Sequence, residues 1–381
     1  MYMEEIEVNV TNLEDDNGIN LQVELPQYPK KAKKRTKEIE KQLKKEKKLM
    51  SLNNACKVLI LGTGDSGKST VVRQIRLCNS VLFTGEEKEY FKKIIWENVY
   101  VSLKDLLRCA EMLGFTEKSQ EYQENALFMK TFIFDKKKKS FDPNVVRVMT
   151  SLWEDHDIKE TFKRKSELKN MHIQDTAINF FNELDRILDV NYIPTDQDIV
   201  LCRRQTCNIT ETVLAVPKLG TIKFYDVGGQ KHLRNFWVPY FEDCHAILFI
   251  AALSCFDQNM AEEEGTNRMV DCISLFNIIV NNPSLQNITI VLFLNKVDLF
   301  KEKLKLTNVS DYFEDFKAPQ SEKSAANFFI EKFKGTTTRQ LKYIHLTTGT
   351  DSKLMKKIIG TVLTIITKLS LKASGLVEDS I

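Results

Sequence analysis

The stretch "LILGTGDSGKST", Leu59 to Thr70, decides the fold. The apolar run "KVLILG" that enters it is typical of a buried central strand, and "KSTVVRQIRL" after it has the spacing of a helix. A strand followed by a helix is the context that the phosphate-binding pattern GxxxxGK[ST] requires, and Gly62, Gly67, Lys68 and Ser69 satisfy that pattern. A chance match in a flexible turn is the alternative, and the flanking strand and helix argue against it.

The chemistry of this loop predicts a bound nucleoside triphosphate. Backbone N–H groups at a helix N-terminus can surround phosphate oxygens, and the glycines allow the close approach. Lys68 adds a positive charge, and the Ser69 hydroxyl can ligate Mg²⁺. The loop does not identify the base, because adenine and guanine enzymes share it.

A second motif favours guanine. The segment "IVLFLNKVDLF" places Asn295, Lys296 and Asp298 at the C-terminal end of another buried strand, where open α/β sheets bind ligands. The Asp298 carboxylate can accept hydrogen bonds from N1–H and the exocyclic amine of guanine, which adenine does not offer in that arrangement. Alone, this four-residue pattern is more often a surface loop. Together with the phosphate loop it indicates guanine, and both motifs must then belong to one pocket.

A third segment, "TIKFYDVGGQ", reads as another strand with functional residues after it. Asp226 can hold Mg²⁺ through a water molecule, and Gly228 can offer its N–H to a γ-phosphate. Gln230 would then orient the water that attacks the phosphate.

Composition limits the class of protein. A chain of 381 residues, 43% hydrophobic and 28% charged, suits a globular protein long enough for two cores. The net charge of +3 is too small to indicate general nucleic-acid binding. The eight cysteines lack CxxC spacing and the chain opens without a signal peptide's apolar core, which favours a reducing cytosol. The longest apolar run, Ala246 to Leu253, is far shorter than the roughly 20 residues that span a bilayer.

The first fifty residues change from acidic to basic composition. The segment "KKAKKRTKEIEKQLKKEKK", residues 30–48, predicts a helix with one narrow apolar stripe. It is either a solvated charged helix or a docking helix for a partner or an anionic membrane surface, and the sequence does not choose between them.

From about Lys37 to Val377 the chain resembles the α subunits of heterotrimeric G proteins. The segments that carry the resemblance occur in family order: "GTGDSGKST", "NYIPTDQDIV", "DVGGQ", "FEDCHAILFIAALS", "NRMVDCISLF" and "FLNKVDLF". A long insertion follows the phosphate loop, which separates this family from Ras-like small GTPases. Part of it, "DTAINFFNELDRILDV", has helical apolar spacing, which suits an inserted all-helical domain.

The resemblance implies an α/β fold. We expect a Ras-like P-loop GTPase domain, with a mostly parallel six-stranded sheet and flanking helices, an inserted all-α domain and an N-terminal helix. The expected division is a disordered acidic extension at 1–29, a basic helix at 30–54, the GTPase domain at 55–77 and 197–381, and the helical domain at 78–196.

In "TDQDIVLCRRQTCNI" the resemblance aligns Arg203 with the family's built-in arginine finger and Thr206 with a Mg²⁺ ligand. Such an arginine neutralises charge that builds on the phosphates in the transition state. Arg204 stands where the family has an apolar residue, so either guanidinium can point inward, and Arg203 is our prediction. The implied catalytic residues are Arg203 and Gln230, and the implied metal ligands are Ser69, Thr206 and, through water, Asp226. The implied nucleotide contacts are Gly62, Asp65, Ser66, Gly67, Lys68, Ser69, Thr70, Asp175, Thr176, Leu201, Arg203, Gly228, Gly229, Asn295, Lys296, Asp298, Gly349 and Thr350.

Two pairs are expected around the nucleotide. Asp65 stands where the family has glutamate and is expected to pair with Arg203, while Asp175 is expected to meet Lys296 and close the cleft. "TTGT" replaces the family's TCAT, and Gly349 keeps the N–H that recognises guanine O6.

The second switch, "QKHLRNFWVPYFED", departs further from the family. Arg234 is expected to pair with Asp271, where the family has glutamate. Leu233 and Phe236 replace charged residues, either by drift or as an apolar landing site for a partner. Near the C-terminus, residues 353–372 predict an amphipathic helix leading into "LKASGLVEDSI", which resembles the receptor-reading tail. Its expected apolar face is Leu354, Ile358, Val362, Ile366 and Leu369.

The function that the resemblance implies is a GTP-hydrolysing switch controlled by a seven-helix receptor. The implied partners are a βγ dimer, effector proteins and GTPase-accelerating regulators, at the cytoplasmic face of the plasma membrane. The chain begins "MYMEEIEV", with Tyr2 where the family commonly has glycine, so N-myristoylation is not expected. We expect indirect, salt-sensitive attachment through residues 30–48 and βγ, and the alternative is a cytosolic subunit without βγ. Two other functions compete, a scaffold that retains GTP without useful turnover and an adenine-using P-loop enzyme.

Overall fold

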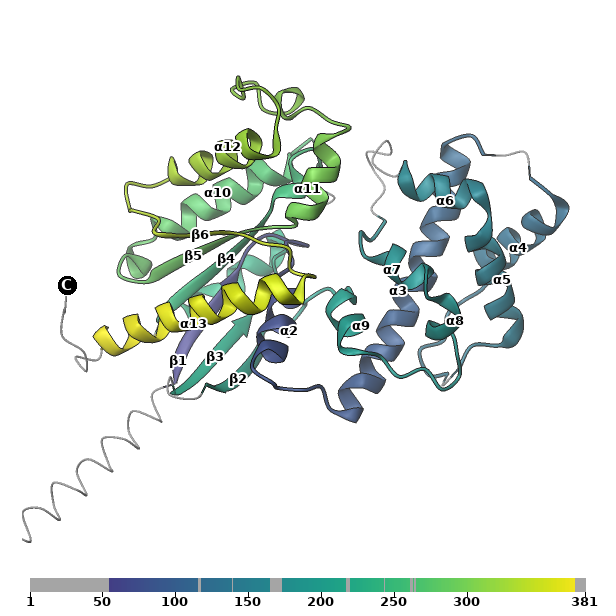
Figure 1. Ribbon diagram of the computed structural model, residues 1–381, viewed down its shortest axis with the longest axis horizontal. Helices are drawn as coiled ribbons and strands as arrows, with labels where there is room; N and C mark the ends of the chain where they lie inside the picture. The colour runs from purple at the N-terminus through teal and green to yellow at the C-terminus, as the bar shows by residue number, and fades with distance from the viewer. Residues whose placement is uncertain are drawn as a thin grey trace, which may run out of the picture. The chain divides into compact units, whose positions relative to one another are not determined.

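In the part of the chain that the computed structural model describes, six strands form one sheet in the order β2-β3-β1-β4-β5-β6 (Figure 1). They span β1 Cys56–Leu61, β2 Thr210–Val216, β3 Gly220–Asp226, β4 Ala246–Ala252, β5 Thr289–Asn295 and β6 Tyr343–Leu346. Neighbouring strands pair in parallel, except that β2 runs antiparallel to β3. The predicted mostly parallel six-stranded sheet is therefore confirmed.

The structure describes residues 55–115, 118–138, 140–164, 173–216, 220–242, 244–260, 263 and 265–373, with side chains up to Lys368. The acidic extension, the predicted basic helix and the tail after Ala373 lie outside these residues. The described residues belong to the unit that begins at Ala55.

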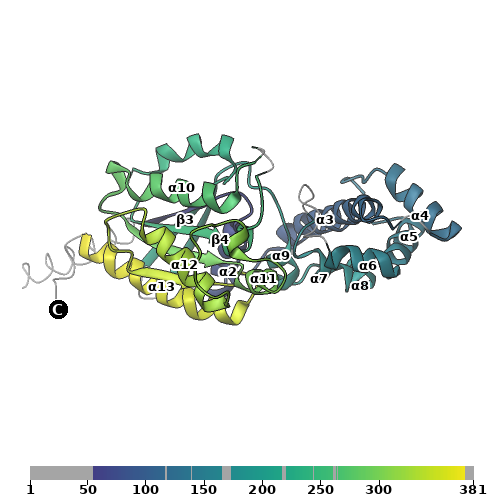
Figure 2. The same ribbon diagram turned by 90° about the horizontal axis from the view of Figure 1, so that it is seen from above.

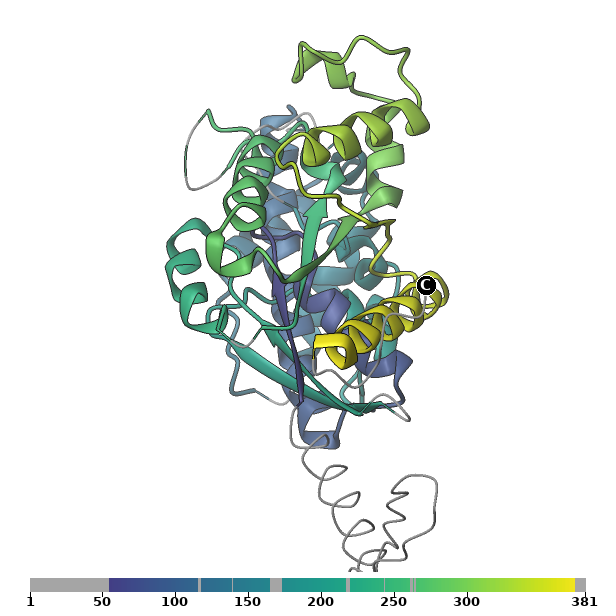
Figure 3. The ribbon, with the colours of Figure 1, turned by 90° about the vertical axis from the view of Figure 1, so that its left-hand side faces the viewer.

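Alternation along β1 explains how helices cover both faces of the sheet. Val58 and Ile60 contribute to one apolar core, and Leu59 and Leu61 contribute to another on the opposite face. Figures 2 and 3 show α13 on one side of the strands and α10 on the other. The α-helices that belong with the sheet are α2 Lys68–Cys78, α9 Asp196–Leu201, α10 Arg268–Val280, α11 Val297–Leu304, α12 Glu322–Lys334 and α13 Ser352–Ala373. Short 3₁₀ helices span η2 Lys231–Tyr240, η3 Leu253–Cys255, η4 Pro283–Leu285 and η5 Val309–Asp311.

The segment between α2 and α9 is helical and has a hydrophobic core of its own. Its helices are α3 Gly85–Met112, α4 Gln120–Thr131, α5 Pro143–Glu154, α6 His156–Lys163, α7 Ala177–Phe181 and α8 Leu184–Ile187. Thr84 begins α3 with a capping box to Glu87. The expected insertion of helices is therefore present, while the exact division at residues 78 and 196 stays a prediction.

Two helical segments differ in detail from what their apolar spacing suggests. The helical spacing of "DTAINFFNELDRILDV" corresponds to two short helices, α7 and α8, which are separate because Glu183 leaves helical geometry between them. Helix α13 exists, but its buried face includes Met355, Ile359 and Leu363 as well as the predicted Val362 and Ile366, whereas Leu354 and Ile358 are half-buried. The helix packs against both α2 and the sheet, so its apolar face is wider than a single stripe.

None of the helices in the described part of the chain combines the length and apolar character needed to cross a lipid bilayer. No disulfide joins the eight cysteines, all of which lie in that part.

Candidate functional site

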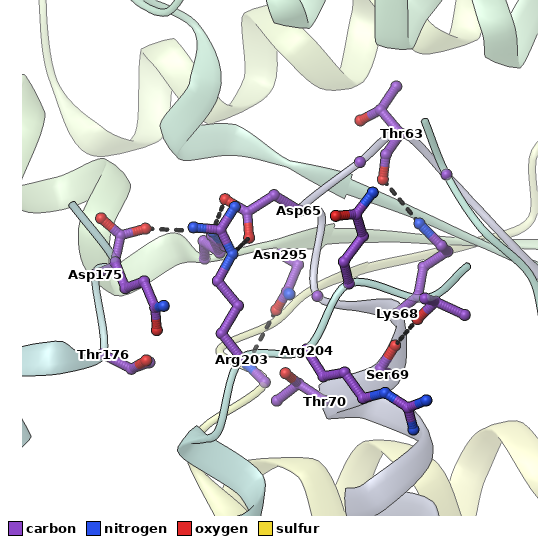
Figure 4. A pocket seen from close by; sticks show the side chains of 18 of the residues that line it. Thr63, Asp65, Lys68, Ser69, Thr70, Asp175, Thr176, Arg203, Arg204 and Asn295 are labelled. Atoms are coloured by element: carbon purple, nitrogen blue, oxygen red, sulfur yellow. Dashed lines mark hydrogen bonds and ion pairs between the residues drawn. The ribbon is translucent and has the colours of Figure 1, made fainter. Parts of the chain in front are cut away.

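A cavity of about 510 Å³ opens at the carboxyl ends of the parallel strands (Figure 4). That volume lies within the usual range of small-molecule sites. Sheet-domain loops after β1, β5 and β6 form part of its wall, and Gln174, Asp175 and Thr176 from the helical segment face them. The cavity is therefore lined by the sheet part and by the helical segment of the chain, at the edge of the sheet where α/β folds bind ligands.

Most predicted nucleotide contacts line this cavity. They are Asp65, Gly67, Lys68, Ser69, Thr70, Asp175, Thr176, Leu201, Arg203, Gly229, Asn295, Lys296, Asp298, Gly349 and Thr350. Thr206 and Gln230 line it too. Gly62, Ser66 and Gly228 are not among the lining residues.

The phosphate loop has the backbone that its glycines predict. Gly67 has a φ of 99°, and a side chain there would collide with the Asn295 amide. The Lys68 ammonium lies inside the loop and donates to the carbonyls of Gly62 at 3.1 Å and Thr63 at 2.8 Å. Burial lowers the pKa of Lys68 to about 8, although nearby carboxylates act to raise it. A buried cation surrounded by loop backbone is suited to a phosphate ligand.

Asn295 connects the three loops that would surround a base. Its Nδ2 donates to the Ser66 carbonyl at 2.9 Å, and its Oδ1 accepts from Thr347 Oγ1 at 3.0 Å and from the Gly349 N–H at 2.9 Å. Asn295 is buried, so these bonds hold the loops together from within. The Gly349 N–H, predicted to recognise guanine, donates to Asn295 in this structure, and Asp298 faces the cavity beside it.

Three oxygen-bearing side chains meet below the phosphate loop. Ser69 Oγ donates to Asp226 Oδ2 at 2.6 Å and lies 2.8 Å from Thr206 Oγ1. Asp226 is buried, which raises the pKa of its carboxyl, and its Oδ1 has no hydrogen-bond partner. No cluster of three or more His, Cys, Asp or Glu side chains suited to a metal occurs in the described ranges. Two hydroxyls and one carboxylate with an unpaired oxygen instead fit Mg²⁺, which prefers oxygen ligands and keeps several waters.

Three cationic side chains surround the Asp65 carboxylate in the wall of the cavity. Its carboxylate lies 3.5 Å from Arg203 Nε, 3.4 Å from Lys296 Nζ and 3.9 Å from Arg268 Nη2. Burial alone would raise the pKa of Asp65, but these three cations outweigh it and hold the pKa well below its usual range. Lys296 also reaches Asp175 Oδ2 at 3.3 Å. Both expected pairs, Asp65 with Arg203 and Lys296 with Asp175, are therefore in contact.

The two adjacent arginines point in different directions. Figure 4 shows Arg203 reaching to Asp65 and Arg204 extending the other way. The Arg204 guanidinium stacks over the ring of Tyr90 in α3, 5.0 Å from its centroid. Arg203 is therefore the arginine beside the phosphate loop, as the sequence predicts.

Gln230 lies over the phosphate loop, close to Gly64. Its Oε1 accepts a hydrogen bond from the amide of Gln205, which lies in the segment 202–209 between α9 and β2, here called the first switch. Gly228 lies deeper, where its carbonyl accepts from Trp237 Nε1 at 2.9 Å and Leu233 packs against it.

Arg234 and Asp271 form the expected pair in the second switch. Nη1 donates to Oδ1 at 2.9 Å and Nη2 to Oδ2 at 2.5 Å, a bidentate contact. Of the two apolar replacements, Leu233 is half-buried against Gly228 and offers little surface to a partner. The exposed apolar residues here are Phe236, 63% exposed, and Val238, 62% exposed.

The sequence did not predict several residues whose side chains bond the backbone around the site. Arg268 Nη2 donates to the Gly64 carbonyl at 2.8 Å, and the buried Arg73 donates to the carbonyls of Ile199 and Cys202. Asn98 bonds the backbone of Arg203. Arg268 lies within "NRMVDCISLF", a segment that signalled the family without assigning this residue a role. Asn98 and Arg73 sit within helices whose pattern carries no such signal.

Comparisons with known proteins agree with this geometry. A family model described as "G-protein alpha subunit" matches residues 33–366. The "G-protein complex alpha subunit gpaA" of Aspergillus fumigatus is 35% identical over 352 residues, which cover 91% of this chain and 98% of the relative. The "Guanine nucleotide-binding protein alpha-1 subunit" of Neurospora crassa is 34% identical over 352 residues, with the same coverage of 91% and 98%. The chain thus belongs to the G-protein alpha-subunit family, whose members are GTP-hydrolysing signalling switches.

Proposed function

We propose that this GTPase switch works through the residues of the cavity, with Mg²⁺ beside the nucleotide. The observation that carries the proposal is convergence: segments at 62–70, 203–206, 226–230 and 295–298, far apart in sequence, surround one site. Residues 55–77 and 197–381 would form the GTPase domain and residues 78–196 the domain that closes over the nucleotide.

Binding is assigned to the loops after β1, β5 and β6. Lys68 and the N–H groups at the start of α2 hold the phosphates. Asp298 accepts from the guanine edge, and Gly349 can offer its N–H to guanine O6 by exchanging its bond to Asn295. The Lys296 to Asp175 contact then closes the cleft from the helical side.

Ser69, Thr206 and Asp226 would hold the magnesium ion. Held there, Mg²⁺ would supply positive charge that offsets the charge developing on the phosphates. The unpaired Oδ1 of Asp226 supports this assignment, because a buried carboxylate oxygen without a partner is costly unless a cation or water satisfies it.

Hydrolysis is assigned to Arg203 and Gln230. Arg203 leaves part of its contact with Asp65 and places its guanidinium against the transferring phosphoryl group. Gln230 exchanges its contact with Gln205 for the attacking water. Both side chains line the cavity, so each needs a local rotation rather than a rearrangement of the fold.

The switch itself would follow from loss of the γ-phosphate. Thr206 and Gly228 would lose their contacts with this phosphate. The second switch, which contains Arg234 and is held by its ion pair with Asp271, would then relax. Phe236 and Val238 lie on that surface, which makes them candidates to contact partners in one nucleotide state.

Partners and place are proposed from family membership. A seven-helix receptor would drive exchange, a βγ dimer would bind the GDP state, and effectors and GTPase-accelerating regulators would bind the GTP state. The protein would work peripherally at the cytoplasmic face of the plasma membrane, where the basic segment 30–48 contacts anionic lipid. Vesicle flotation at low and high salt, with and without residues 1–50, tests this contact, and salt-resistant binding by the truncated chain would refute it.

Single-turnover hydrolysis of preloaded GTP by the purified chain tests the central proposal. We expect phosphate release by the unaltered chain and its loss in Gln230→Leu, with bound nucleotide retained. Absence of release from the unaltered chain would favour a GTP-retaining scaffold. Displacement of GTP by excess ATP would favour an adenine-using enzyme.

A further inference from the structure

Asn98, on the helical-domain helix α3, forms two hydrogen bonds with the main chain of Arg203. Its Nδ2 donates to the Arg203 carbonyl at 2.9 Å, and its Oδ1 accepts from the Arg203 N–H at 2.8 Å. One carboxamide thus satisfies both polar groups of one residue, the exchange that a neighbouring β-strand would provide. Asn98 is 6% exposed, so water does not compete strongly for these bonds.

The Arg203 backbone lies where regular structure is absent. Helix α9 ends at Leu201 and strand β2 begins at Thr210, and the described residues 202–209 between them form neither helix nor strand. Arg73 holds the carbonyl just before Arg203, and Ser69 contacts Thr206 just after it. Asn98 bonds both main-chain polar groups of Arg203 itself, whose carbonyl also lies 4.0 Å from Cys202 Sγ.

The Arg203 side chain needs this backbone anchor. Its side chain is 43% exposed and its ion pair with Asp65 spans 3.5 Å, so the side chain alone does not hold the charge in place. A long side chain projects from its Cα, and a shift of the backbone is carried to the guanidinium. A displacement of about 1 Å in catalytic geometry can lower a rate about a hundredfold.

We propose that Asn98 is a positioning residue for GTP hydrolysis, acting by holding the main chain of Arg203. The inference rests on the role proposed above for Arg203. It assigns to α3 a part in the chemistry besides covering the nucleotide. Asn98 is not among the residues that line the cavity, so its effect on hydrolysis would pass through Arg203.

The test is a double-mutant cycle in the full chain, read by single-turnover hydrolysis of preloaded GTP. We expect Asn98→Ala to slow hydrolysis by about tenfold to a hundredfold, while affinity for a nonhydrolysable GTP analogue changes less than about threefold. In an Arg203→Ala background, Asn98→Ala should cause no further loss, because the side chain it positions is gone.

Ser102→Ala is the matched control. Ser102 lies one turn further along α3, is 1% exposed, and its Oγ has no hydrogen-bond partner in the described structure. Removal of the Ser102 hydroxyl should leave the hydrolysis rate unchanged. A slower rate in Ser102→Ala would show that hydrolysis responds to a general loosening of α3. Asn98→Asp keeps the volume and the acceptor for the Arg203 N–H but places an oxygen against the Arg203 carbonyl, so it should also slow hydrolysis.

An unchanged rate in Asn98→Ala, or an equal further loss in the Arg203→Ala background, overturns the proposal. Thermal unfolding of the loaded proteins shows whether each variant folds. If Asn98→Ala does not fold, the same double-mutant cycle is measured with Asn98→Asp in its place, and the same two outcomes overturn the proposal. If Arg203→Ala itself leaves hydrolysis intact, the proposed role of Arg203 fails first, and this outcome is distinct from failure of Asn98 alone.

Discussion

Asp65 Oδ1 lies 3.5 Å from Nε of Arg203, which joins the phosphate loop to the first switch. The other carboxylate oxygen faces Lys296 at 3.4 Å, so the same side chain also contacts the loop after β5. Asp65 adopts a φ of 60°, a left-handed conformation that is uncommon for residues with a side chain. The loop thus presents its carboxylate in a strained but well-paired position, at the meeting point of three segments.

Neutralising this carboxylate should loosen the closed cleft. In Asp65→Asn the cations Arg203, Lys296 and Arg268 keep their mutual repulsion and lose the charge that balances it. We expect faster release of fluorescent GDP, by about tenfold, which corresponds to about 1.4 kcal/mol. Stopped-flow displacement by excess unlabelled GDP measures the rate. Asp185→Asn, an exposed carboxylate on α8, is the control, and equal rates in both variants would contradict the prediction.

The neighbouring arginines should differ in their effect on catalysis. Arg203→Ala should lower the hydrolysis rate by about three orders of magnitude with nearly unchanged nucleotide binding, because transition-state charge loses its partner. Arg204→Ala should change the rate less than about threefold, since its guanidinium stacks on Tyr90 away from Asp65. Single-turnover phosphate release compares them.

Tyr90→Ala removes the same stacking from the other side and should behave like Arg204→Ala. If Arg204→Ala were the damaging change, the register assigned to the first switch would be wrong by one residue.

The second switch should respond to loss of its bidentate pair. Asp271→Asn weakens a charge-assisted contact with the Arg234 side chain, which is 15% exposed. We expect the GTP-state arrangement to become less favourable by about 1–3 kcal/mol. Trp237 donates to the Gly228 carbonyl and reports this region by its fluorescence. The fluorescence change on exchange of GDP for a nonhydrolysable GTP analogue should become smaller in Asp271→Asn.

Trp237→Phe shows how much of that signal comes from Trp96 and Trp153, the other two tryptophans. A full-sized signal in Asp271→Asn would mean that the pair does not hold the active arrangement.

Short contiguous patterns explain what the sequence could predict. The phosphate loop and the segments at Asp226 and Asn295 each follow an apolar strand directly, so residue type and local context together indicate their place. The contacts of Asn98 with Arg203 and of Arg268 with Gly64 escaped prediction because the partner groups are backbone carbonyl and N–H groups of distant segments, which nearly every residue possesses. The same limit applies to Leu233, whose burial depends on packing against Gly228 rather than on its own neighbours in sequence.

Acid should unfold the protein partly through Asp198 in α9. Its carboxylate accepts from Arg186 at 2.8 and 2.9 Å, from the Tyr192 hydroxyl at 3.1 Å and from the Thr195 N–H at 2.9 Å. Burial acts to raise the pKa of Asp198, but the Arg186 and Thr195 bonds outweigh it, so the pKa is lowered. A lowered pKa means that the folded state favours the ionised carboxylate. This stabilisation is complete above the unfolded pKa of about 4 and is lost as pH falls further.

At pH 7, Asp198→Asn should therefore lower the free energy of unfolding by about 2–3 kcal/mol, because a buried charge-assisted network loses its anion. Between pH 5 and pH 3, both proteins lose stability because other carboxylates become protonated. The unaltered chain should lose more, since Asp198 is protonated as well, so the difference in the free energy of unfolding between the two proteins narrows. Urea unfolding of the GDP-bound proteins across this range measures it. Asp185→Asn should leave the curve unchanged. A gap between Asp198→Asn and the unaltered chain that stays constant down to pH 3 would show that the ionised form of Asp198 is not what stabilises α9.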